Sequence, residues 1–137
     1  MENRAEMSVG EISIISDEDV ILARQKVRLQ AQEMGFSLLN QTRLVTAVSE
    51  LARNIVVHAK EGKVSVFKAR AGDKTGLKVV FEDRGPGIPD IEKAMEEGFS
   101  TVGSMGIGLK GARRLVDEFD IKSFPGKGTT VTIKKWL

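Results

Sequence analysis

The 137-residue sequence contains no cysteine, three prolines and few aromatic residues, with one Trp and no Tyr. Without cysteine the chain can form neither disulfides nor thiolate metal sites. The scarcity of aromatic side chains removes the stacking platforms on which single-stranded nucleic acids usually bind. No apolar run approaches the roughly 20 residues of a membrane-spanning helix, and the N-terminus lacks the pattern of a secretory signal. We therefore expect a cytoplasmic protein that binds neither membrane nor nucleic acid.

Neither basic nor acidic residues are in large excess. The chain has 21 Lys and Arg against 19 Asp and Glu, which leaves a net charge of +2. Basic and acidic residues alternate along the sequence, whereas a protein that tracks a nucleic-acid backbone concentrates its basic residues in one patch. The composition, 41% hydrophobic and 29% charged, is that of a globular protein. A chain of this length usually forms one domain, so we expect a single domain over residues 1–137.

Hydrophobic periodicity divides the chain into helices and strands. Residues 1–8 are polar and expected to be frayed. A capping-box-like start at 16–19 and a stop at Gly35 bound the first helix. The expected order is a strand at 11–15, helices at 16–35 and 38–59, a hairpin of strands at 63–70 and 77–82, a loop at 84–89, a short helix at 90–97, a loop at 98–105, a helix at 107–119 with Phe119 on its buried side, and a closing hairpin of strands at 120–124 and 129–136.

This order of elements predicts an α+β fold. Runs of strands and helices that do not alternate regularly favour a sheet whose helices lie on one side. We expect a two-layer α/β sandwich in which an antiparallel or mixed sheet is covered by helices on one face.

Glycine is concentrated in one part of the chain. Seven of the 14 glycines fall between residues 85 and 111, more than turns and helix ends require. Residues 106–111 match G-x-G-x-x-G, but no strand precedes them, and Leu109-Lys110 after Gly108 breaks the Walker pattern. A glycine-rich segment before a helix still suits an anion, because free N–H groups and the helix dipole meet there. An unusually loopy connection is the alternative interpretation.

The second helix carries Glu50 and Asn54 four residues apart, and therefore on one face. With His58 they lie at the border of the apolar arc. A carboxylate and a carboxamide at this border can hold a hard cation such as Mg²⁺, which needs one or two protein ligands plus phosphates. The same pattern fits a Glu and an Asn at the edge of solvent, and His58 alone is better explained as structural.

A strand ends in Glu82-Asp83, and a turn with Gly85, Pro86 and Gly87 follows. Asp83 at the strand end can accept a hydrogen bond from the exocyclic amine of adenine. Guanine has an acceptor at that position, so a carboxylate would discriminate against it. A plain Asp-Gly turn explains this segment equally well.

Together these segments resemble the GHKL ATP-binding superfamily, which contains gyrase B, Hsp90, histidine kinases and MutL. The blocks are E-L-A-R-N at 50–54, D-R-G-P-G at 83–87, G-S-M-G-I-G at 103–108 and G-T-T at 128–130. Within it, the chain is similar to the small bacterial anti-sigma-factor kinases, and to the stressosome switch kinases in particular, through S-E-L-A-R-N at 49–54, E-D-R-G-P-G-I-P-D-I at 82–91, E-E-G-F-S-T at 96–101 and D-E-F at 117–119. The lid differs from that of the switch kinases around 102–105 and at Lys110.

The resemblance implies the Bergerat (GHKL) ATP-binding fold, ATP and Mg²⁺ as cofactors, and a role for each motif residue. Asn54 would bind Mg²⁺, Glu50 would be the general base, and Asp83 would recognise adenine. The remaining nucleotide-binding residues would be Gly85, Gly87 and Thr129 around the base and Gly103, Gly106 and Gly108 in the lid. A carboxylate base suits phosphate transfer to a hydroxyl group, which must lose a proton, whereas an imidazole acceptor needs little such help.

The expected function is therefore phosphorylation of Ser or Thr on STAS-domain proteins, together with binding and activation of a PP2C-type phosphatase in stress signalling. A second hypothesis is a nucleotide-dependent binding module that sequesters a sigma factor or activates a phosphatase with little kinase activity. A nucleic-acid-binding domain, the third, rests only on the pI of about 9.0.

Overall fold

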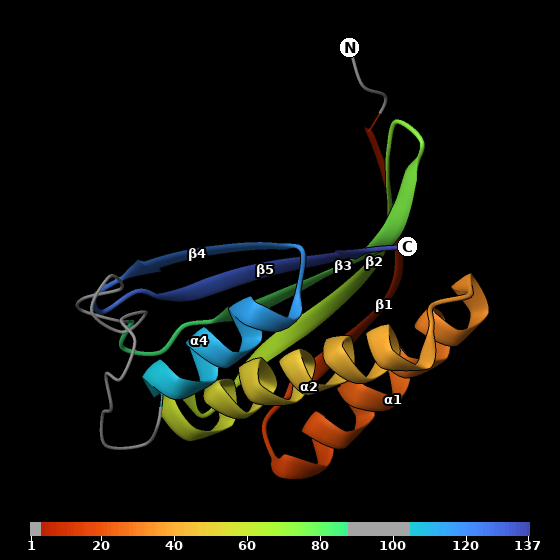
Figure 1. Ribbon diagram of the computed structural model, residues 1–137. Coiled ribbons are helices and arrows are strands. Elements are labelled where there is room, and N and C mark those ends of the chain that lie inside the picture. Colours follow the sequence, from red (N-terminus) through yellow and green to blue (C-terminus); the bar gives the residue numbers. More distant parts are fainter. Residues whose placement is uncertain (1–3, 88–104) are drawn as a thin grey trace.

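The computed structural model describes residues 4–87 and 105–137, and these form a five-stranded sheet with helices on one side (Figure 1). The strand order is β1-β2-β3-β5-β4, and every neighbouring pair is antiparallel. This confirms the α+β architecture with helices on one face. The mixed sheet that we allowed for is wrong for the described residues, because each connection between neighbouring strands brings the chain back in the opposite direction.

The elements are, in chain order, β1 Arg4–Ile14, α1 Asp17–Met34, α2 Leu38–Asn54, a π-helical turn Ile55–Ala59, β2 Gly62–Ala71, β3 Lys74–Asp83, α4 Met105–Leu115, β4 Glu118–Phe124 and β5 Gly128–Trp136. The expected helix at 90–97 and nearly all of the expected loop at 98–105 lie outside the described residues.

Local sequence signals account for the helix ends. The backbone N–H of Ser16 donates to Asp19 Oδ2 at 3.1 Å, which completes the start of α1 as the sequence predicted. Gly35 ends α1 in the left-handed conformation with φ 86°. Ser37 starts α2 by accepting a hydrogen bond from the N–H of Asn40. The first two helices therefore form an αα-hairpin with a three-residue connection, residues 35–37.

Long-range pairing extends the strands beyond the local predictions. Residues 4–8, which we expected to be frayed, belong to β1 and pair with β2 from Arg4–Ala71 to Ser8–Phe67. The last helix is also shorter than predicted, since Phe119 lies in β4 opposite Ile133 of β5. In both places the backbone hydrogen bonds of a partner strand outweigh the pattern of the local sequence.

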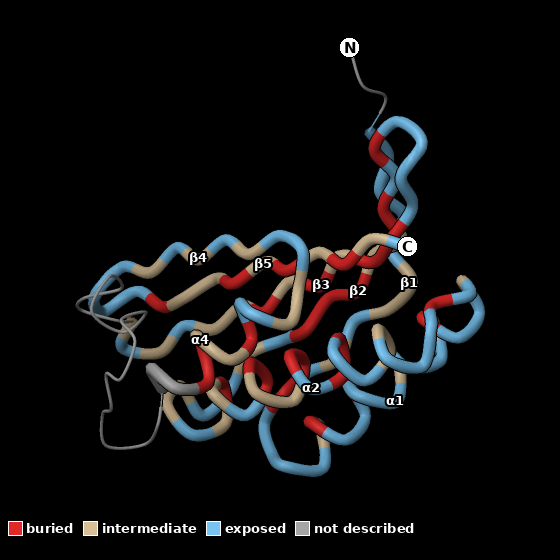
Figure 2. Tube along the Cα trace, viewed as in Figure 1, coloured by how far each residue is buried: buried red, intermediate tan, exposed pale blue. Residues whose placement is uncertain are grey.

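The core lies where the helices meet the sheet, and Figure 2 shows the buried residues there. Fully buried side chains come from both layers, among them Val27, Leu44, Leu51, Val66 and Ile133. The outer faces of α1 and α2 are exposed. Within the described part of the chain, no helix combines the length and the apolar character needed to cross a lipid bilayer.

Candidate functional site

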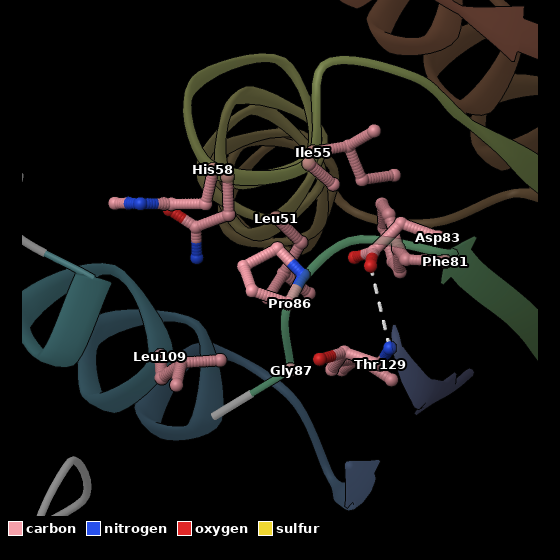
Figure 3. A pocket seen from close by; sticks show the side chains of 12 residues that line it. Leu51, Ile55, His58, Phe81, Asp83, Pro86, Gly87, Leu109 and Thr129 are labelled. Atoms are coloured by element: carbon pink, nitrogen blue, oxygen red, sulfur yellow. Dashed lines mark hydrogen bonds between the residues drawn. The ribbon is translucent and has the colours of Figure 1, made fainter. Parts of the chain in front are cut away.

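A pocket lies between the end of α2 and the turn that follows β3, and Figure 3 shows it from close by. Four of the residues singled out from the sequence line it, namely Asn54, Asp83, Gly87 and Thr129. The other lining residues are Leu51, Ile55, His58, Ala59, Phe81, Pro86, Leu109 and Val131. Residues up to 80 positions apart in the sequence, from Leu51 to Val131, therefore form one apolar pocket with polar groups at its edge.

Asp83 is held in place by the backbone around it. Its Oδ1 accepts hydrogen bonds from the N–H of Gly85 at 2.9 Å and from the N–H of Thr129 at 3.3 Å. The second bond, drawn in Figure 3, joins the end of β3 to the start of β5. Both backbone donors use Oδ1, and the other carboxylate oxygen, Oδ2, accepts no hydrogen bond from the residues that the structure describes.

Glycines allow the turn to pack closely against its neighbours. A Cβ on Gly85 would lie 2.6 Å from Cβ of Ala59, and one on Gly128 would collide with the carbonyl oxygen of Asp83. Gly87 has φ 78°, and a Cβ there would lie 2.5 Å from the carbonyl oxygen of Phe124. The turn is therefore wedged between the end of α2 and the β4–β5 connection, and only glycine fits at these points.

The helical side of the pocket brings Glu50 and Asn54 close to α4. A Cβ built on Gly108 would lie 3.3 Å from both Oδ1 and Nδ2 of Asn54, and 3.6 Å from Glu50 Oε2. The absence of a side chain at Gly108 thus keeps open the space between these polar groups and the first turns of α4. Leu109, which is 2% exposed, reaches the pocket from the same helix.

The end of α2 widens into the π-helical turn Ile55–Ala59, a feature that often occurs at functional sites. The turn is followed by Lys60 with φ 71°, an uncommon conformation for a residue other than glycine. His58 lines the pocket, and its buried Nε2 has no hydrogen-bond partner among the described residues. Buried polar atoms without a partner are rare, so His58 is a candidate ligand contact that the sequence analysis set aside as structural.

The other predicted site residues lie around the pocket. Glu50 stands beside Asn54 towards α4, and Gly85 packs behind Asp83 against Ala59; neither lines the pocket. Gly106 belongs to α4, whereas Gly103 lies outside the described residues. The apolar lining residues and Gly128 were not predicted as site residues. Their signal in the sequence is the hydrophobic pattern, which does not distinguish a pocket wall from the core.

The pocket suits a flat apolar ligand with a hydrogen-bond donor at its edge. Its floor consists of aliphatic and aromatic side chains, and the acceptor Asp83 stands at one side. The cavity between these side chains is small, about 30 Å³. Helix α4 contributes one wall of the pocket through Leu109.

Comparisons with known proteins agree with this geometry. A model of the family "Histidine kinase-, DNA gyrase B-, and HSP90-like ATPase" matches residues 39–137. A Bacillus subtilis protein, serine/threonine-protein kinase RsbT, is 48% identical over 92% of this chain and 95% of its own length. An anti-sigma F factor from a Thermoanaerobacter species is 34% identical over 84% of this chain and 83% of its own length.

A solved structure has a similar fold. The crystal structure of the RsbU and RsbW domains of a Mycobacterium tuberculosis protein matches 97% of this chain with a TM-score of 0.62 and 22% sequence identity. This chain spans about a third (32%) of the length of that solved chain.

Proposed function

Because the chain belongs to the family of histidine kinase-, DNA gyrase B- and HSP90-like ATPases, we propose that it is a protein serine/threonine kinase that transfers the γ-phosphate of ATP to a STAS-domain protein. The similarity to a serine/threonine-protein kinase along nearly the whole chain supports the reaction. The resemblance of the sequence blocks to anti-sigma-factor kinases supports the kind of acceptor. The protein acts in the cytoplasm, and residues 1–137 form one catalytic domain.

Adenine occupies the apolar pocket in this proposal. Asp83 Oδ2 accepts a hydrogen bond from the exocyclic amine, because Oδ1 already accepts two backbone bonds. Gly87 and Thr129 lie against the base, and Gly85 lies behind them. Nε2 of His58 forms a hydrogen bond with the bound nucleotide. The triphosphate extends towards the first turn of α4, where free backbone N–H groups favour an anion. Gly103, Gly106 and Gly108 form the lid.

Asn54 is the residue that would hold Mg²⁺. Its carboxamide has no hydrogen-bond partner among the described residues, and Gly108 leaves space beside its oxygen. An amide oxygen suits this hard cation, which takes its remaining ligands from phosphates and water. When bound, the metal neutralises charge on the phosphates.

Glu50 is the general base for the acceptor hydroxyl. The serine or threonine oxygen attacks the γ-phosphorus, the bond from this phosphorus to the β–γ bridging oxygen breaks, and ADP leaves with the electron pair. The hydroxyl proton passes to the Glu50 carboxylate. The observation that carries the proposal is that Glu50 Oε2 and the Asn54 carboxamide converge on one point at Gly108, beside the pocket that holds Asp83.

A second function is the binding of regulatory proteins. The similarity to anti-sigma F factors favours a nucleotide-dependent binding role, and the partner we propose is a PP2C-type phosphatase that the chain activates. If the chain is a binding module with little kinase activity, a nucleotide in the same pocket would set its conformation.

Transfer of label from [γ-³²P]ATP to a serine of a purified STAS-domain protein separates the two functions. We expect Glu50→Ala to lower the rate of transfer by about 10²- to 10⁴-fold, the usual contribution of a general base, while ATP and partner binding stay unchanged. Glu50→Gln, which keeps the shape of the side chain, is the control for packing. If the wild type labels no STAS-domain protein but still binds a phosphatase or a sigma factor, the binding function is the correct one.

A further inference from the structure

The connection between α4 and β4 is bound to the end of β5 by polar contacts. The backbone N–H of Asp117 donates to the carbonyl oxygen of Lys134 at 3.0 Å. The Asp117 carboxylate accepts the backbone N–H of Trp136 through Oδ2 at 2.7 Å, and its Oδ1 lies 3.4 Å from Nζ of Lys135. Asp117 therefore contacts three consecutive residues of β5. It begins the D-E-F block at 117–119, which does not line the nucleotide pocket.

Lys135 is the one buried charged residue among residues 4–87 and 105–137, with 7% of its surface exposed. It follows Ile133 of the core by two positions, so both side chains lie on the same face of β5. A buried ammonium group is costly unless an anion compensates it, and Asp117 supplies that anion. Replacement of a buried ion pair by apolar groups often leaves stability unchanged. Stability alone therefore does not explain this pair.

Helix α4 leads from the nucleotide pocket to the ion pair. Leu109 lines the pocket and lies six residues before Leu115, the last residue of α4, which is about 9 Å along the helix axis. Between its ends, α4 packs against α2 and the core through apolar side chains such as Ala112. Apolar packing is non-directional and permits small shifts of a helix, whereas hydrogen bonds have a preferred distance and angle. The contacts of Asp117 are therefore suited to fix where α4 ends.

We propose that Asp117 and Lys135 are positioning residues for the nucleotide site. Their ion pair fixes the C-terminal end of α4 on the sheet, and with it the position of Gly108 and Leu109 near the other end. A Cβ on Gly108 would lie 3.3 Å from the Asn54 carboxamide, so a small shift of α4 changes the space beside this group. The inference rests on the proposed function for the identity of the ligand. Its physical consequence is that loss of the pair lowers the affinity for Mg-ATP without an equal loss of stability.

The double variant Asp117→Asn/Lys135→Met tests the proposal on the full chain. Asparagine keeps an oxygen for the N–H of Trp136, and methionine keeps most of the apolar stem of the lysine, so the charges are removed while the packing is retained. We expect the Kd for Mg-ATP to rise by about 3- to 30-fold in calorimetric titration, with a Tm close to that of the wild type. Without nucleotide, the amide hydrogens of α4 should exchange faster than in the wild type.

The matched control is Glu118→Gln/Lys134→Met. This pair also joins β4 to β5, with Oε1 and Nζ 3.9 Å apart, and Lys134 lies on the opposite face of β5 from Lys135. The control removes the same two charges as the test variant and leaves Asp117 in place. Its Kd for Mg-ATP and its amide exchange in α4 should equal those of the wild type.

An unchanged Kd in the test variant would overturn the proposal, whether or not the Tm falls, because the pair then has a structural role alone. A control variant whose Kd rises as much would overturn it too. If the double variant does not fold, Lys135→Met alone replaces it, since this change leaves a carboxylate that is 39% exposed and no buried charge.

A wild type that binds no Mg-ATP contradicts the proposed function instead. Amide exchange without nucleotide then decides the role of the pair by itself. Faster exchange in α4 of the test variant, with no change in the control, supports the positioning role. Equal exchange in the test variant and the wild type contradicts it.

Discussion

On the sheet side of the pocket, Asp83 and the turn after it are held by two backbone hydrogen bonds and by contacts that only glycine permits. On the helical side, Glu50, Asn54 and His58 project from α2 and its π-helical turn, and their side chains have no hydrogen-bond partner among the described residues. One wall is thus complete without a ligand, whereas the other has polar groups left for one.

The difference matches the two tasks that we propose for the pocket. Recognition of a base requires an acceptor whose position does not vary, because a misplaced hydrogen bond loses its discrimination. Metal binding and proton transfer require side chains whose lone pairs are free before the ligand arrives. Substitutions in the two walls should therefore have different effects on nucleotide binding and on stability. The following predictions test that difference, from the largest expected effect to the smallest.

Asn54→Ala should have the largest effect on nucleotide binding. It removes the only protein ligand that we assign to Mg²⁺, so affinity for Mg-ATP should fall by more than about 100-fold, beyond the loss typical of outer-shell residues. Thermal stability should hardly change, since the side chain has no hydrogen-bond partner in residues 4–87 and 105–137 to lose. Calorimetric titration with and without EDTA measures this. If Asn54→Ala binds Mg-ATP as the wild type does, the metal lies elsewhere and the helical wall has another role.

Gly128→Ala, at the sheet side of the pocket, should lower the stability of the protein. Its φ of 118° is unfavourable for alanine, and the new Cβ would collide with the carbonyl oxygen of Asp83. We expect a loss of about 2–4 kcal/mol in the free energy of unfolding, from strain and overpacking together. Urea unfolding followed by circular dichroism is the measurement.

Two glycines provide matched controls for that experiment. Gly126 has φ 77°, and a Cβ there would meet no atom within 4 Å, so Gly126→Ala should cost only the backbone strain of about 1 kcal/mol. Gly111 lies in α4 with open space around it, and Gly111→Ala should stabilise the protein by up to about 1 kcal/mol. Equal losses at positions 126 and 128 would mean that the close contact with Asp83 contributes nothing.

Asp83→Asn should have a smaller effect on nucleotide binding than Asn54→Ala, and a more specific one. The backbone N–H groups of Gly85 and Thr129 would hold the amide oxygen of the new side chain, which turns its NH₂ group towards the pocket. A donor would then face the exocyclic amine of adenine, at a cost of about 1–3 kcal/mol in ATP affinity. ITP, which has a carbonyl in place of that amine, should bind the variant better than ATP. Parallel losses for ATP and ITP would show that Asp83 does not contact this edge of the base.

Much of the fold and the order of the site segments could be predicted from the sequence, because the signals are local. Helix starts and stops depend on side chains within three or four positions, as at Ser16, Gly35 and Ser37. The pairing of β2 with β3 through a short turn is likewise local. The placement of Asn54, Asp83 and Thr129 around one pocket follows the prediction from the sequence blocks, while their chemical roles stay predictions.

What the sequence determined by itself was the list of chemical groups and the elements that carry them, since periodicity and capping act over a few residues. Only the tertiary structure decided that residues 4–8 and Phe119 are strand, because their partners lie 14 or more positions away. It likewise decided which oxygen of Asp83 the backbone holds, because one of the two donors to Oδ1 comes from Thr129, 46 positions later. Contacts of this length depend on how complete strands pair, and no local pattern contains that information.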